Sequence, residues 1–355
     1  MPESTIFKIK QLVTPMARSF IHDYLSTVKR YNDKRRCLHF DNGSRCNEFI
    51  SAHSIQKKGQ LQLIAEDGHI YRLSADFATL DKSGGIPLPK KVGIGKASTF
   101  VGFCKNHDNA LFEPIDNEFL KANKQQVALY AYRSLCREYF VKDNAVKALQ
   151  ELKNHKDLDS DEQSYLAASL IGHTLGFDEL KNHKTNYDSA LMRLCFDEFE
   201  FVYFKSTSRC PLQLSGLSYL DYDFLGQDLR DLNNGNSAQG LITFFTAPTD
   251  TGWAFGFAWH ISSGPSCRSL IRSLKVRLSG GAKLEDMLLR FSLSCCENHA
   301  MRISWWDALS AQSKKSALNR MSLMAHPSAP VPANYLAIGC DGIANWRFDS
   351  AFSSQ

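Results

Sequence analysis

The sequence predicts a mixed α+β protein, in which a small loop-rich module, a helical segment and a β-rich C-terminal domain follow one another. Three observations support this fold class. Cysteine and histidine residues gather in short groups between residues 37 and 107. Apolar residues recur at helical spacing from about residue 117 to residue 194. Aromatic runs that alternate like strands follow after residue 196.

Composition places the chain among ordinary globular proteins. Its 355 residues allow two or three domains, and 43% of them are hydrophobic and 22% charged. No apolar run approaches the roughly 20 residues that span a bilayer, and the first five residues lack the blocks of a secretory signal. We therefore expect a cytoplasmic protein without membrane insertion, whose ten cysteines are free thiols and metal ligands rather than disulfides.

The first two segments are expected to differ in character. Residues 1–36 predict an N-terminal helical segment, because apolar residues between Phe7 and Val28 recur at helical spacing, with Pro15 as a kink. Residues 37–116 predict a module of short strands and turns. Inside it, residues 60–95 read as an insertion. There, residues 61–64 and 69–73 flank a Glu-Asp-Gly turn and predict a hairpin, and residues 83–89 predict a loop.

The remaining chain divides near residue 196. Residues 117–195 predict a helical segment, and the acidic stretch 157–162 is suited to a helix start. Residues 196–355 predict a mixed, β-rich domain of unknown role. Its expected strands are residues 199–204, 241–245 and 253–259, the last two joined as a hairpin, and its expected helices are residues 266–274 and 309–323.

Four side chains have the chemistry of a closed metal site. Cys37 and Cys46 are separated by eight residues, and Cys104 and His107 form a Cys-x-x-His pair. The turn residues that follow Phe40 can bring the first two sulfurs together. Three thiolates and one imidazole make a tetrahedral zinc set, so we expect a structural Zn²⁺. Ordinary buried cysteines are the alternative, and His39 is an alternative ligand.

A histidine lies between these two pairs, on a run that alternates like a strand. His53 follows Cys46 by seven residues, within residues 49–56. A neutral histidine on a rigid strand can serve as the general base that activates water against a phosphodiester. Taken alone, a core or surface histidine without a catalytic role is the simpler interpretation.

These residues resemble the zinc-containing branch of the HNH nuclease family, which has a ββα-metal core. The resemblance covers about residues 37–116: residues 52–56 look like its first motif, and residues 99–108 look like its last two, an asparagine-led segment and a knuckle that opens a helix. It implies that His53 is the general base and that Asp108 binds a catalytic Mg²⁺ or Mn²⁺. The chain departs from the family pattern at Ala52, Thr99 and Phe112, where ligands or an asparagine are usual. Glu113 or His69 could replace the missing cation ligands.

The resemblance implies a metal-dependent endonuclease or nickase acting on DNA, with RNA still open, and restrained by its C-terminal region. It also suggests bacterial anti-phage defence of the Zorya type, with a regulatory protein partner. The competing hypothesis is a catalytically inactive, zinc-stabilised module that binds nucleic acid or protein, which Ala52 and Phe112 favour. Three basic clusters beside the ligands would attract phosphates, although the net charge is only +5. The clusters are Lys29, Arg30, Lys34, Arg35 and Arg36; Lys57 and Lys58; and Lys90, Lys91 and Lys96.

Two features of the C-terminal domain are open to more than one interpretation. All five tryptophans lie in the last third of the chain, where they could stack on bases but more often form core. Residues 295–299, Cys-Cys-Glu-Asn-His, could hold a catalytic Cys–His pair, although a position at the edge of a β-rich core explains them equally well.

Overall fold

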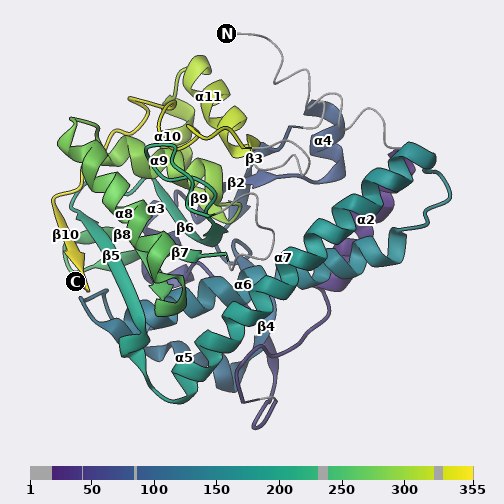
Figure 1. The fold of residues 1–355 in the computed structure, drawn as a ribbon, viewed down its shortest axis with the longest axis horizontal. Helices are drawn as coiled ribbons and strands as arrows, with labels where there is room; N and C mark the ends of the chain where they lie inside the picture. The colour runs from purple at the N-terminus through teal and green to yellow at the C-terminus, as the bar shows by residue number, and fades with distance from the viewer. Residues whose placement is uncertain (1–17, 42, 84–85, 231–238, 324–330, 355) are drawn as a thin grey trace.

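The structure is a computed structural model that describes residues 18–41, 43–83, 86–230, 239–323 and 331–354. It confirms a mixed α+β fold (Figure 1). Its helices are α2 (Arg18–Asn32), α3 (Gln62–Ile64), α4 (Phe77–Ser83), α5 (Lys105–Asp116), α6 (Lys124–Leu152), α7 (Ser160–Met192), α8 (Gly264–Ser279), α9 (Leu284–Cys295), α10 (Ile303–Ala308) and α11 (Ala311–Met321). Its strands are β1 (Phe49–His53), β2 (His69–Ser74), β3 (Leu88–Gly93), β4 (Thr99–Cys104), β5 (Phe199–Ser206), β6 (Leu212–Tyr219), β7 (Leu241–Thr249), β8 (Gly252–His260), β9 (His299–Met301) and β10 (Ser350–Ser353).

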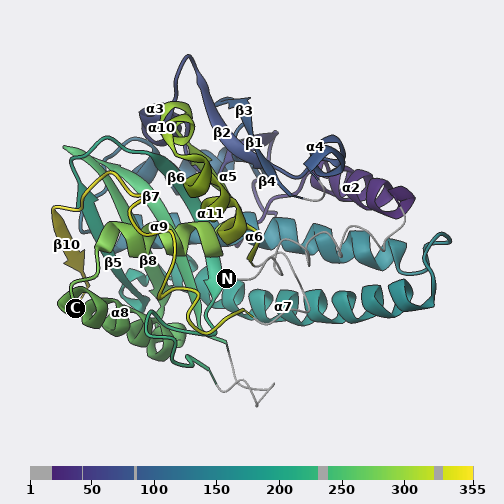
Figure 2. The same ribbon diagram turned by 90° about the horizontal axis from the view of Figure 1, so that it is seen from above.

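An eight-stranded sheet in the order β10-β5-β8-β7-β6-β9-β2-β3 forms the middle layer. Alternate side chains of β5 are buried on opposite faces of this sheet. Val202 and Phe204 join the core beneath α8 and α9, whereas Phe201 and Tyr203 join the core beneath α6. The sheet is therefore covered by helices on both sides, as the turned view shows (Figure 2). The predicted hairpin of residues 241–259 is confirmed, with Thr249 opposite Gly252 at its turn.

The small module contains a unit of two paired strands followed by a helix. β1 and β4 form a separate antiparallel pair in which Ile50 faces Phe103 and Ala52 faces Phe100, and α5 follows β4 directly. Phe100, Phe103 and Phe112 bury the inner side of this unit against α6. The position of Phe112, with 0% of its surface exposed, explains why an apolar residue stands there.

The two long helices α6 and α7 confirm the predicted helical segment. They run side by side away from the sheet, and α2 lies along α6 at their far end (Figures 1 and 2). The start of α7 follows from the acidic stretch: Asp159 accepts from two backbone N–H groups, and the Glu162 side chain accepts from the Asp159 N–H. For the N-terminal segment, α2 is described from residue 18 onward; residues 1–17, Pro15 among them, lie outside the described residues.

The expected hairpin within residues 60–95 is wrong in its first arm. Residues 62–64 are helical, because Leu61 and Ile64, three residues apart, both point into the core beneath the sheet. The turn itself is present, with positive φ at Asp67 (48°) and Gly68 (71°). The loop expected at residues 83–89 ends early, since β3 begins at Leu88. β2 and β3 pair with each other and extend the large sheet, so this insertion belongs to the same sheet as the C-terminal strands.

The two expected C-terminal helices are present as α8 and α11, whereas α9 and α10 were not expected, and the tryptophans are core. Trp253, Trp259, Trp305, Trp306 and Trp346 expose between 2% and 6% of their surface. Within the described part of the chain, no helix combines the length and apolar character needed to cross a membrane.

Candidate metal centre and the histidine face beside it

Backbone hydrogen bonds to β4 position the first cysteine. The Arg36 N–H donates to the Val101 carbonyl at 3.1 Å and the Leu38 N–H donates to the Gly102 carbonyl at 2.9 Å, so Cys37 lies alongside β4. Cys104 ends β4 and also caps α5, because its sulfur accepts from the His107 N–H at 3.5 Å. His107 therefore stands in the first turn of α5, close to the Cys104 sulfur.

The structure brings all four predicted ligands together. The donor atoms of Cys37, Cys46, Cys104 and His107 lie within 4.8 Å of one another. His107 Nδ1 is 3.3, 3.6 and 3.2 Å from the sulfurs of Cys37, Cys46 and Cys104. A tetrahedral zinc ion with ordinary bond lengths separates sulfur from nitrogen by about 3.5 Å. The cluster therefore fits a metal ion such as zinc.

The closeness of the three thiols also favours a cation. Burial, together with the neighbouring sulfurs of Cys37 and Cys104, raises the pKa of the Cys46 thiol to about 12. Three thiols this close cannot all ionise without a compensating positive charge, which a divalent metal supplies on binding.

A carboxylate that was not predicted from the sequence contacts His107 on the side away from the sulfurs. Asp41 Oδ2 lies 2.7 Å from His107 Nε2, the ring nitrogen that faces away from the sulfurs. Histidine ligands commonly place their second nitrogen against such a carboxylate, which orients the ring and raises its basicity. His39, the alternative ligand, stacks on the His107 ring at 4.1 Å and contacts Asp41, so it belongs to this outer layer.

His53 lies at the end of β1, on the strand pair that also carries Cys104. Its Nε2 is 3.2 Å from the Ile94 carbonyl, which fixes an Nε2–H tautomer and leaves Nδ1 as the acceptor. Burial is the main reason that the pKa of His53 lies below its ordinary value, so the ring is neutral near pH 7. Its neighbour Ala52 packs against the core with 3% of its surface exposed.

Asp108 does not meet His53 in a second metal site. Arg133 of α6 reaches the inner side of α5, where both of its terminal nitrogens bind Asp116, at 2.7 and 2.9 Å, and its guanidinium packs 4.0 Å over the Phe112 ring. Asp108 interacts with this positive charge, although burial dominates and raises its pKa, and its Oδ1 has no hydrogen-bond partner. A guanidinium thus supplies the positive charge beside Asp108.

The side chains do not fit a catalytic cation as the sequence predicted it. Among the described residues, clusters of three or more potential ligands comprise only the Cys₃His centre and His39, Asp41 and His107. Glu113 faces a polar hollow of about 820 Å³ on the outer side of α5, and His69 lies in the β2 turn with its Nδ1 2.6 Å from the Asp67 carbonyl oxygen. Neither joins Asp108 in a cluster of potential ligands within the described part of the chain.

A buried polar network joins Ser54, the residue after His53, to the C-terminal domain. The Ser54 hydroxyl is 2.7 Å from the Ser98 hydroxyl, and both hydroxyls bind the side-chain amide of Asn298. Asn298 has 0% of its surface exposed and also donates to the Ser215 carbonyl. The Cys-Cys-Glu-Asn-His segment therefore contributes an amide that bridges two parts of the chain, and His299 beside it is buried.

The basic clusters differ in how much of their charge is neutralised. In the first cluster, Arg36 pairs with Asp143 at 2.8 Å and packs over Phe140, and Arg30 pairs with Glu151. Lys34 and Arg35 of the same cluster, and Lys57, Lys58 and Lys96 of the other two clusters, are exposed and form no ion pair with any described residue. Lys57 and Lys58 follow β1, and the charge of Lys57 acts on His53. Lys96 stands two residues after Ile94, whose carbonyl contacts the His53 ring.

Comparisons of the chain with protein-family models, curated proteins and solved structures find no match.

Proposed function

We propose that this chain binds nucleic acid along the surface of the unit formed by β1, β4 and α5, and that its Cys₃His centre holds a structural zinc ion. Lys57, Lys58 and Lys96 carry the proposal, because these three unneutralised charges lie on the segments that follow β1 and Ile94, next to the half-buried His53. Exposed lysines of this kind bind backbone phosphates and release counterions. The sequence resemblance of residues 37–116 to HNH nucleases favours the same interpretation by analogy.

Zinc would act in this proposal as a structural ion. Cys37, Cys46, Cys104 and His107 would bind it and hold the start of the module, β4 and α5 together. No open coordination position is needed for that role. The lysines then project from a face whose backbone is fixed by the centre.

Phosphodiester hydrolysis is the second candidate function, and His53 is the observation that favours it. A neutral imidazole whose Nε2–H donates to Ile94 presents Nδ1 to solvent or substrate as a proton acceptor. In this candidate His53 removes a proton from the water that attacks phosphorus. The Arg133 guanidinium beside Asp108 argues instead for binding without cleavage. A role in anti-phage defence and a regulatory partner stay predictions.

Binding is tested with fluorescently labelled DNA and RNA at several salt concentrations. The variant K57Q/K58Q/K96Q should bind duplex DNA more weakly, and the slope of log affinity against log salt should fall by about 2.7, because each phosphate contact contributes about 0.9. The matched control K153Q/K156Q/K315Q removes the same charge from exposed lysines elsewhere. Equal binding by both triple variants would refute the proposed face.

Cleavage is tested on supercoiled plasmid with Mg²⁺ or Mn²⁺. If hydrolysis occurs through His53, His53→Ala abolishes nicking but preserves DNA affinity and metal content, since a general base acts in the chemical step. His69→Ala serves as the control. Nicking that survives in His53→Ala would exclude this second function.

A further inference from the structure

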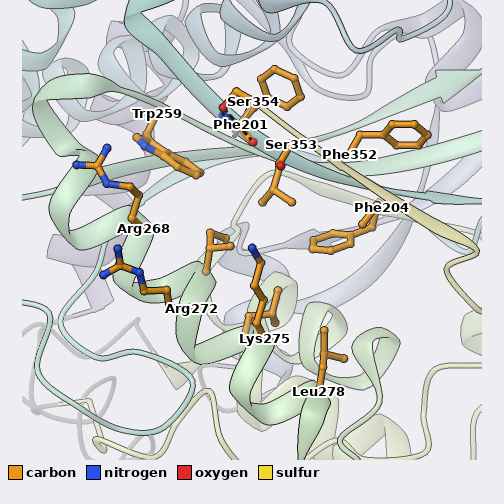
Figure 3. A pocket seen from close by; sticks show the side chains of 14 residues that line it. Phe201, Phe204, Trp259, Arg268, Arg272, Lys275, Leu278, Phe352, Ser353 and Ser354 are labelled. Atoms are coloured by element: carbon orange, nitrogen blue, oxygen red, sulfur yellow. Dashed lines mark hydrogen bonds between the residues drawn. The ribbon is translucent and has the colours of Figure 1, made fainter.

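A cavity remote from the metal centre lies between the C-terminal strand and α8. β10 pairs with β5 at the edge of the large sheet, and α8 covers the neighbouring face, which leaves a cavity of about 320 Å³ between them (Figure 3). This volume is at the small end of the range for small-molecule sites.

The walls of this cavity are largely apolar. Val202, Phe204 and Trp259 come from the sheet and Ile271 and Leu274 from α8, each with no more than 8% of its surface exposed. These side chains keep their positions through the core that they share, so the wall is preformed. Such a wall is complementary to the hydrocarbon or aromatic body of a ligand.

Three cations of α8 line the same cavity, and one of them is neutralised. Arg268 binds both carboxylate oxygens of Glu200 at 2.7 and 2.9 Å, and the Trp259 indole N–H donates to the same carboxylate. Arg272 and Lys275 make no ion pair with any described residue. In Figure 3 the Lys275 amine points from α8 toward the strands, into the cavity.

We propose that this cavity binds a small amphiphilic anion, with its apolar body against Phe204, Ile271 and Leu274 and its anionic head at Lys275 and Arg272. Charge complementarity determines this class. An apolar wall alone would accept a neutral molecule, whereas two unneutralised cations at the rim favour a carboxylate or a sulfonate. A bound ligand would also contact β10 and so hold the C-terminal edge strand to α8.

Two probes distinguish an aromatic from an aliphatic body. Anilinonaphthalene sulfonate is titrated into the full chain and followed by its fluorescence, and decanoate is then added as a competitor. We expect saturable binding of the sulfonate, with displacement if the site also takes an aliphatic carboxylate. Decanol, which has the same chain without the charge, should compete at least tenfold less well than decanoate.

Variants locate the site. R272Q/K275Q should weaken sulfonate binding at least tenfold, because charged hydrogen-bond partners contribute this much or more. Ala351→Trp, an exposed position on β10 that lines the cavity, should block binding by filling the space. The control K153Q/K315Q removes two exposed positive charges elsewhere and should bind as wild type does.

Circular dichroism of each variant confirms that the fold is retained. The proposal is overturned if neither probe binds saturably, if decanol competes as well as decanoate, or if R272Q/K275Q and Ala351→Trp bind like the wild type. Because these measurements involve neither nucleic acid nor metal, their outcome is independent of the function proposed for the zinc module.

Discussion

Replacing Asp41 with alanine should weaken metal binding while all four ligands remain. The Asp41 carboxylate lies 2.7 Å from the His107 nitrogen that faces away from the sulfurs, and its side chain is only 16% exposed. It therefore orients the imidazole from a partly desolvated position. Without it, the ring loses both its orienting contact and part of its basicity toward the cation.

The expected magnitude follows from this role. Removal of such an outer carboxylate typically costs 10- to 100-fold in metal affinity, which corresponds to about 1.4–2.7 kcal/mol. Asp41→Asn keeps an oxygen at the same position and loses only the charge, so its effect should be smaller. The order wild type, Asp41→Asn, Asp41→Ala is itself a prediction.

Competition with a chromophoric zinc chelator measures these affinities directly. Glu48→Ala is the matched control, since it removes an exposed carboxylate of the same module that forms no ion pair with a described residue. Equal zinc affinity in wild type, Asp41→Ala and Glu48→Ala would show that Asp41 does not support His107. A wild-type protein that binds no zinc would remove the metal centre itself.

Three further predictions concern stability. Cys104→Ser should lose the metal, measured by elemental analysis, and unfold, because a structural zinc site contributes about 10 kcal/mol or more in small domains. Asp116→Ala should lower the free energy of unfolding, measured in urea, by about 3 kcal/mol, which is the lower end for a broken buried pair. The lower end applies because the Arg133 side chain is 4% exposed but the Asp116 side chain is 29% exposed. The double variant Asp116→Ala/Arg133→Met should recover part of this loss, and no loss in the single variant would contradict the buried pairing. Burial lowers the pKa of His299 to about 4 in the folded protein. An unfolded chain binds this proton below about pH 6.5, so the stability of the fold should decline as the pH falls from about 6.5 toward 4. His299→Gln should show a shallower decline over this range, and an unchanged decline would exclude His299 as its source.

The sequence predicted the metal centre well because its signal is local. Cys104 and His107 are three residues apart at a strand-to-helix junction, and a turn between Cys37 and Cys46 brings these sulfurs together. The aromatic strands and the start of α7 were predicted for the same reason. Alternation and capping act over a few residues and survive most tertiary contexts.

Residues that act across the fold were missed. Arg133 is one polar residue in a helix, and nothing nearby in the sequence shows that it reaches Asp116 and Phe112. Asn298 was noticed only as part of a possible Cys–His pair, whereas its amide binds Ser54 and Ser98. The signal that could have found Arg133 was its position on an otherwise apolar, core-facing stretch of α6, where a buried cation requires an acidic partner.

The first arm of the expected hairpin failed because a short apolar run is ambiguous. Leu61 and Ile64 satisfy a helical spacing as well as a short strand, and the core beneath the sheet selected the helix. Likewise, the treatment of residues 60–95 as an insertion did not reveal which sheet would receive β2 and β3. The pairing of Tyr71 with Met301 depends on chain that lies far away in sequence.

That pairing also sets the order in which the molecule can assemble during synthesis. β9 has three residues, yet it stands between β6 and β2 in the sheet. Until residue 301 has emerged, the hairpin of β2 and β3 carries an open edge that can pair with another chain. Contacts this distant along the chain also make folding slow. A metal ion bound by Cys37, Cys46, Cys104 and His107 would link the two ends of the chain segment that contains β2 and β3. This link would hold the hairpin in place before β9 is synthesised and pairs with β2.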